Sequence, residues 1–165
     1  MKMDIVWATG PEPQELTPDE LPVLYRRTFD IINSTLFNGE LPPIKTEKGQ
    51  RSDALGAFYA TIRTYNDNPE KEPQIINPKI ELDTSEAAVY GINEDNINVL
   101  FHEMTHYYCL LHGIEDTDSG SNYHNLNFKK AIEAHGGKCE YDGPQNGYSY
   151  TELPEDIVNA IWDQI

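Results

Sequence analysis

Residues 101–108 read FHEMTHYY and contain the pattern His102-Glu103-x-x-His106. On a helix, residues four apart lie on the same side, about one turn apart, so both imidazoles can bind one zinc ion. Glu103 can then reach a zinc-bound water without occupying the metal. Zinc lowers the pKa of that water, and the carboxylate takes its proton as the water attacks a carbonyl group. The motif predicts a zinc site with Glu103 as the general base; the alternative is an exposed helix face that carries two histidines and no metal.

The opposite side of the same helix is predicted to face the core. Apolar residues recur there at helical spacing, at Ile97, Leu100, Phe101, Met104, Tyr108 and Leu111. A helix that packs on this stripe presents His102 and His106 on its other side. Cys109, one turn beyond the motif, is expected to be a small buried residue.

A catalytic zinc ion usually has three protein ligands and one open position, so a third ligand is needed. His112 follows His102 at the spacing of the metzincins, but Cys109 stands where metzincins need a glycine. The Met-turn is also absent, because no methionine follows Met104. His112 is therefore expected at the helix end, where its charged form is favourable.

Two further residues compete for the third position. Glu133 would give a thermolysin-like arrangement, but Lys129 and Lys130 beside it favour a solvated helix residue. His124 begins the next predicted helix, after a loop long enough to fold back, and we favour it as the third ligand.

The pattern of elements along the chain predicts one α+β domain. A polar connection over 45–53 is expected after the first helix, and Pro78 suggests that its strand lies at a sheet edge or is interrupted. Asn93 is expected to cap the motif helix. In chain order we expect a helix over 17–39, strands over 55–65 and 74–83, helices over 93–112 and 122–137, a short strand within 145–153, and a helix over 154–165.

Composition and charge limit the partners and the location. The 165 residues carry a formal net charge of −16, from 28 acidic and 12 basic residues. Direct binding to nucleic acid or to an anionic membrane is therefore disfavoured. The N-terminal sequence lacks a signal peptide, no stretch is apolar enough to span a membrane, and two cysteines do not make a disulfide framework. A cytoplasmic location is expected.

The chain resembles the SprT-like metalloproteases from about Leu24 to Gly137. The resemblance rests on LFNGELP, LGAFYATIR, IELD, HEMTH and HNLNF. In this family the helix after the motif opens with His-Gly-x-x-Phe, and its histidine is the third zinc ligand. His124 and Phe128 match that element, whereas Asn125 replaces the glycine. The C-terminal cysteine zinc ribbon of many relatives is absent, since Cys139 is the one cysteine of that region.

The resemblance implies a zincin-like domain, with a small mixed sheet packed against an active-site helix and additional helices. It implies a single domain over 1–165, with its core over about 17–137 and a C-terminal strand and helix over about 147–165. It also implies one catalytic Zn²⁺ on His102, His106 and His124, with Glu103 as the base.

On this resemblance we expect a zinc-dependent metallopeptidase of this compact type, with a protein or peptide as its substrate. Tyr123, Tyr148 and Tyr150 are candidates to stabilise the oxyanion. Two alternatives are a non-catalytic acidic interaction protein on the same scaffold, motivated by the net charge of −16, and a zinc hydrolase acting on an amide that is not a peptide bond. The sequence does not select a cleavage preference or an oligomeric state.

Overall fold

The structure is a computed structural model that describes residues 20–49, 55–82, 92–119 and 121–165. These residues form four helices, a three-stranded sheet and a two-stranded sheet. The predicted α+β class is confirmed. None of the helices among these residues has the length and apolar character needed to cross a membrane.

Helix α1 spans Glu20–Leu36 and packs its apolar side into the core through Tyr25, Phe29 and Ile32, each at most 1% exposed. The first three residues of the helix predicted over 17–39 lie outside the described residues. The helix ends at the predicted place, where Asn38 and Gly39 adopt positive φ.

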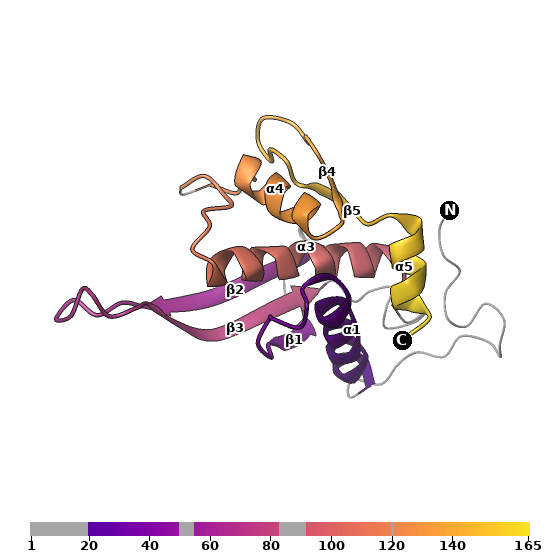
Figure 1. Cartoon of the computed structure of the whole chain (residues 1–165), viewed down its shortest axis with the longest axis horizontal. Helices are drawn as coiled ribbons and strands as arrows, with labels where there is room; N and C mark the ends of the chain where they lie inside the picture. Colours follow the sequence, from indigo (N-terminus) through magenta and orange to yellow (C-terminus); the bar gives the residue numbers. More distant parts are fainter. Residues whose placement is uncertain (1–19, 50–54, 83–91, 120) are drawn as a thin grey trace.

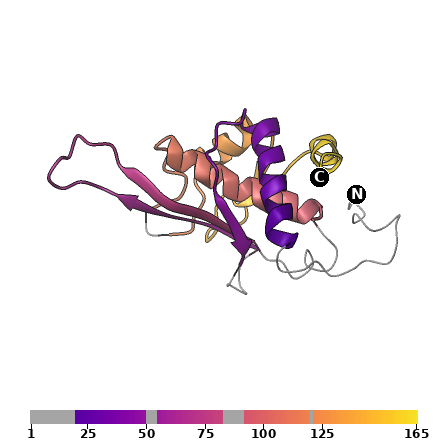
Figure 2. The same ribbon diagram turned by 90° about the horizontal axis from the view of Figure 1, so that it is seen from below.

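The main sheet has the strand order β1-β3-β2. Strands β1 (Lys45–Lys48) and β3 (Gln74–Leu82) are parallel, whereas β2 (Gly56–Arg63) is antiparallel to β3. A polar connection was predicted over 45–53, and its first residues instead form strand β1. Beyond β1, the β2–β3 hairpin extends away from the body of the molecule in both views (Figures 1 and 2).

Pro78 lies in the central strand, not at an edge, but the strand is interrupted around it. The register shifts between Tyr59 and Thr61, so that Asn77 and Pro78 together face Ala60. Asn77 has a φ of 49°, and β1 pairs with β3 only from Lys79 onward. Pro78 therefore occupies a β-bulge beyond the last β1 pairing, where its missing N–H costs no ladder hydrogen bond.

Helix α3 (Glu94–Leu111) is the central element. It lies between the three-stranded sheet and a second layer made by α4 and the small sheet (Figure 1). Asn93 caps it as predicted: its Oδ1 accepts the Asn96 N–H at 2.9 Å, and the Asn96 side chain accepts the Asn93 N–H at 3.1 Å. Both bonds satisfy N–H groups that the helix leaves without a partner.

The buried side of α3 differs from the predicted stripe at its C-terminal end. Ile97, Leu100, Phe101 and Met104 are at most 1% exposed, as expected, whereas Leu111 is 37% exposed. Tyr107 and Cys109 are buried at 2% and 0%. The burial of Cys109 confirms its predicted role.

The C-terminal part of the chain covers the other side of α3. It comprises α4 (Leu126–Ala134), β4 (Lys138–Glu140), β5 (Tyr150–Glu152) and α5 (Glu155–Trp162). The prediction that α4 begins near residue 122 is wrong, because Asn125 is its cap. His124 precedes that cap in extended backbone, bridged to Thr117 and to Gly147. Strands β4 and β5 pair antiparallel, and α5 buries Val158 and Ile161 in the core.

Candidate metal and catalytic site

The structure brings His102, His106 and His124 together. Their Nε2 atoms lie 3.2, 3.2 and 3.1 Å from one another. Three nitrogens bound tetrahedrally to one zinc ion at 2.0–2.1 Å lie about 3.3–3.4 Å apart. The three histidines therefore lie close enough to bind one metal ion, and they are the group with this geometry among the described residues.

Each of the three imidazoles has a partner on its other nitrogen. His106 Nδ1 lies 2.5 Å from Asp116 Oδ2, and His124 Nδ1 lies 3.1 Å from the Asn146 carbonyl oxygen. A carboxylate and a carbonyl only accept hydrogen bonds, so both Nδ1 atoms carry the proton. The Nε2 lone pairs of these two histidines consequently point at the common centre, and their rings are held in that orientation.

His102 has a different partner. Its Nδ1 lies 2.8 Å from the Thr151 hydroxyl on β5. A hydroxyl both donates and accepts, so this bond fixes the ring but does not by itself determine the tautomer.

Phe128 packs against the whole histidine group. Its ring centroid lies 4.7, 4.6 and 4.8 Å from those of His102, His106 and His124, and the side chain is fully buried. Burial lowers the pKa of His102 well below its ordinary value, assisted by its two histidine neighbours. The pKa of His124 is lowered for the same first reason. Both imidazoles are therefore kept neutral, which is the form that binds a metal.

Glu103 lies on α3 between two of these histidines and is only 6% exposed. Burial raises the pKa of its carboxyl to about 7, although His106 and a hydrogen bond from the Phe58 backbone lower it. Gly56 of β2 makes this burial possible. A Cβ there would lie 2.6 Å from Val99 Cγ1 and 3.3 Å from Glu103 Oε1, so a side chain would force the strand away from α3.

A cleft of about 720 Å³ opens beside His102 and Glu103. Its walls come from the start of β2, the N-terminal half of α3 and the segment 142–151, and include Leu55, Asn96 and Asp142. Of the three tyrosines considered from sequence, Tyr150 lines this cleft, whereas Tyr123 and Tyr148 do not.

The loop that carries Asn146 is fitted closely to His124. The Asn146 carbonyl oxygen also accepts the His124 backbone N–H at 2.9 Å, and Tyr148 N–H donates to the His124 carbonyl at 2.9 Å. Gly147 has a φ of 65°, and a Cβ there would lie 2.2 Å from the His124 carbonyl oxygen. Only glycine fits at this position, because both the backbone conformation and the contact exclude a side chain.

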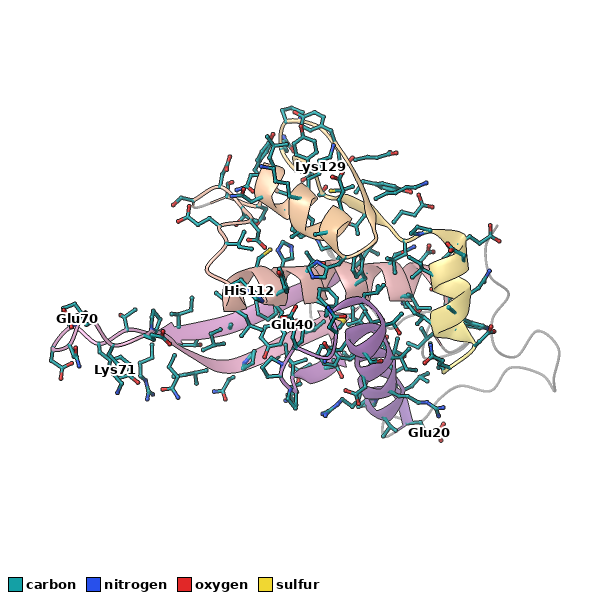
Figure 3. All side chains as sticks on the ribbon, viewed as in Figure 1. Glu20, Glu40, Glu70, Lys71, His112 and Lys129 are labelled. Atoms are coloured by element: carbon teal, nitrogen blue, oxygen red, sulfur yellow. The ribbon has the colours of Figure 1, made fainter. Side chains whose placement is uncertain are left out.

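The two competing third ligands lie elsewhere. His112 is at the end of α3, beside Glu40 (Figure 3). Its Nε2 lies 3.5 Å from the Glu40 carboxylate, and its ring packs on Tyr108. Glu133 is on the exposed side of α4, with its carboxylate 3.7 Å from the ammonium of Lys129. Neither belongs to the group of three histidines.

Sequence reasoning missed the residues that orient the histidines. Asp116, Asn146 and Thr151 follow His102 by 14, 44 and 49 positions. An aspartate shortly after the motif was a weak signal that would have suited a histidine partner. The other two contacts arise only from tertiary folding and leave no pattern in the sequence.

Comparison of the chain with protein-family models, with curated proteins and with solved structures found no match. A function for this protein is therefore inferred from the arrangement of the residues in the site.

Proposed function

We propose that this protein is a zinc-dependent metallopeptidase in which His102, His106 and His124 hold the ion and Glu103 is the general base. One observation carries the proposal: three Nε2 atoms converge within 3.2 Å of one another, and the buried Glu103 shares a cleft with His102.

The donor set suits zinc. Three neutral imidazoles are the ligand set of several catalytic zinc sites, and they leave one coordination position open. When bound, zinc would supply Lewis acidity, which lowers the pKa of water and polarises a carbonyl group.

Glu103 fits the role of base by its position, because it lines the same cleft as His102. Its carboxylate would take a proton from the attacking water and then donate it to the leaving amine. The Glu103 side chain packs closely against Gly56, and this packing holds the carboxylate in one place. Its removal from water strengthens its electrostatic interactions. The cleft of about 720 Å³ has room for several residues of an extended peptide.

The proposal extends to the kind of domain. The resemblance to the SprT-like metalloproteases rests on sequence elements. The α+β architecture agrees with a zincin-like fold, and so do the three histidines that could hold a metal ion, two on α3 and one before α4. We propose a compact SprT-like domain on this basis.

The test compares zinc-loaded protein with its Glu103→Gln variant on a labelled unfolded protein such as casein. Loss of a general base lowers the rate by about 10²–10⁴-fold. We expect the variant to keep its zinc and to lose cleavage by at least about 100-fold. Glu133→Gln is the matched control, because it makes the same chemical change on the exposed side of α4.

Two outcomes would contradict the proposal. If Glu103→Gln cleaves as fast as the parent protein, the base is wrongly assigned. If the zinc-loaded parent cleaves no protein substrate, the peptidase activity itself is wrong, and an interaction protein or a hydrolase of other amides becomes the better explanation.

A further inference from the structure

The cleft beside His102 and Glu103 has two walls of different chemistry. On the side of β2 it is lined by Leu55, which is 68% exposed although its side chain is large and apolar. On the side of the segment 142–151 it is lined by Asp142. Helix α3, which lies between the two layers of the molecule (Figure 1), supplies the residues between these walls.

The α3 residues that line the cleft follow one side of the helix. Asp95, Val99 and His102 are spaced by four and three positions, so they lie in a row. A helix rises about 1.5 Å per residue, which places Val99 about 4.5 Å and Asp95 about 11 Å from His102 along the axis. Because an extended peptide advances about 3.3 Å per residue, this row spans about three residues of a bound peptide.

An apolar surface lies within reach of the proposed base. A Cβ at Gly56 would lie 2.6 Å from Val99 Cγ1 and 3.3 Å from Glu103 Oε1, so the start of β2 packs on both of these side chains. Leu55 precedes Gly56 and lines the same cleft as Val99. An apolar side chain of a bound peptide would remove this carbon surface from water, which is favourable.

The more distant part of the cleft is acidic. Asp95 is exposed in the first turn of α3. The Asp142 carboxylate accepts hydrogen bonds from Ser149 Oγ at 3.2 Å and from Asn146 Nδ2 at 3.3 Å, which hold it in place. Among the described residues that line the cleft, none is a lysine or an arginine. A basic side chain of a peptide is therefore attracted there, and an acidic one is repelled.

We propose that the cleft selects an extended peptide with an apolar side chain beside the scissile bond and a basic side chain about two residues farther away. The apolar side chain packs on Leu55 and Val99. The basic side chain lies near Asp95, and Asp142 on the opposite wall disfavours acidic residues. This inference rests on the proposed function, since it names the substrate class of the same site, but its test measures binding as well as cleavage.

The first test measures the affinity of short labelled peptides for the zinc-loaded Glu103→Gln protein, which should bind them without cleaving them. The peptides carry Leu-Ser-Lys, Asn-Ser-Lys or Leu-Ser-Glu in a glycine and serine background, each also in the reverse order. We expect the best leucine peptide to bind about 10-fold more tightly than its asparagine counterpart. The lysine peptide should bind more tightly than the glutamate peptide, by a ratio that falls as salt is raised from about 0.05 M to about 0.5 M.

Two variants of the same protein locate the apolar contact. Leu55→Ala should reduce the preference for leucine over asparagine to about threefold or less, because it removes most of the apolar contact. Val23→Ala is the matched control, since Val23 lies on α1 and is also 68% exposed. It should leave the preference unchanged, and both variants should melt near the temperature of the parent.

A second pair of variants locates the charge. Asp95 and Asp156 are both exposed and are the second residues of α3 and α5. Asp95→Asn should lower the preference for lysine over glutamate at low salt, whereas Asp156→Asn should not. An equal effect of the two variants would assign the preference to the net charge of the chain and would overturn the role of Asp95.

Equal affinity for the leucine and asparagine peptides, or a leucine preference that Leu55→Ala leaves intact, would overturn the inference. The zinc-loaded parent protein should also cleave the best peptide next to its leucine, as read by mass spectrometry, and cleavage elsewhere would overturn it too. If the parent cleaves none of the peptides while Glu103→Gln binds them selectively, the peptidase function fails and the selectivity of the cleft stands.

Discussion

Burial distinguishes Glu103 from most of the 28 acidic residues of this chain. It is 6% exposed, and desolvation raises the pKa of its carboxyl to about 7. Its carboxyl group therefore keeps its proton to a higher pH than the ordinary value of 4.5 would allow. The packing of α3 on Gly56 is what creates the difference.

The raised pKa of Glu103 has a consequence for the stability of the metal-free protein. The folded carboxyl titrates at about 7 and the unfolded one near 4.5, so the folded state binds more protons between these pH values. The free energy of unfolding therefore falls as the pH rises through this window. Glu103→Gln should remove this loss and make the metal-free protein more stable at pH 8 by roughly 1–3 kcal/mol, with a much smaller gain below pH 5.

Urea unfolding of both proteins at the two pH values, with a chelator present, measures this difference. A gain in stability that is equal at both pH values would show that ionisation of Glu103 is not its cause.

Asp116 holds His106 by a hydrogen bond to Nδ1, and this carboxylate orients the ring and raises the basicity of Nε2. Asp116→Asn should weaken zinc binding by about 10–100-fold, as measured by competition with a chelator. Asp118→Asn is the control, because Asp118 is exposed on the same loop. Among the described residues, no contact joins it to His102, His106 or His124. Equal affinity in the two variants would contradict the role of Asp116.

At the scale of elements, the site is assembled from three separate segments. Helix α3 supplies two histidines, the segment before α4 supplies the third, and residues 142–151 supply partners for His102 and His124. The C-terminal segment is thus part of the site, although no residue in it was predicted to be a ligand.

Gly147 tests this assembly. A Cβ at Gly147 would collide with the His124 carbonyl oxygen, whereas a Cβ at Gly143 would meet nothing within 4 Å. Both glycines have positive φ, at 65° and 89°, so alanine at either position strains the backbone by about 1–2 kcal/mol. Gly147→Ala should also weaken zinc binding, and Gly143→Ala should not; thermal melting and zinc competition on both variants separate the two effects.

The sequence predicted those elements whose signals are local. The bounds and the two faces of α3 could be predicted from three local features, which are the cap at Asn93, the apolar stripe beginning at Ile97, and the histidine motif. Strand β1 was missed because Lys45–Lys48 is short and polar, and it becomes a strand only by pairing with β3. Pro78 was expected at a sheet edge or at an interruption, and the structure shows the interruption. The sequence does not decide between the two, because a bulge depends on the partner strand.

The same distinction between local and tertiary signals applies to the residues of the site. His102, Glu103 and His106 follow from spacing on one helix, and His124 was favoured over His112 and Glu133, neither of which lies with them in the structure. Phe128, Asp116 and Thr151 needed the tertiary structure for their roles, because their contacts cross between elements.

At the scale of the whole molecule, a metal ion would link helix α3, which carries His102 and His106, to the C-terminal layer that carries His124. Because binding to the folded state alone stabilises it, zinc at 100 times its dissociation constant adds about 2.7 kcal/mol to the free energy of unfolding. Calorimetric scans with zinc and with a chelator should therefore differ by several degrees. The same scans on His106→Ala should coincide; a zinc-dependent shift in that variant would place the ion elsewhere.

Counting zinc ions per folded chain by native mass spectrometry decides whether the three histidines form one site. The parent protein should carry about one zinc ion, His124→Ala should carry almost none, and His112→Ala should keep about one. Zinc retained in full by His124→Ala, or lost from His112→Ala, would contradict the site formed by His102, His106 and His124.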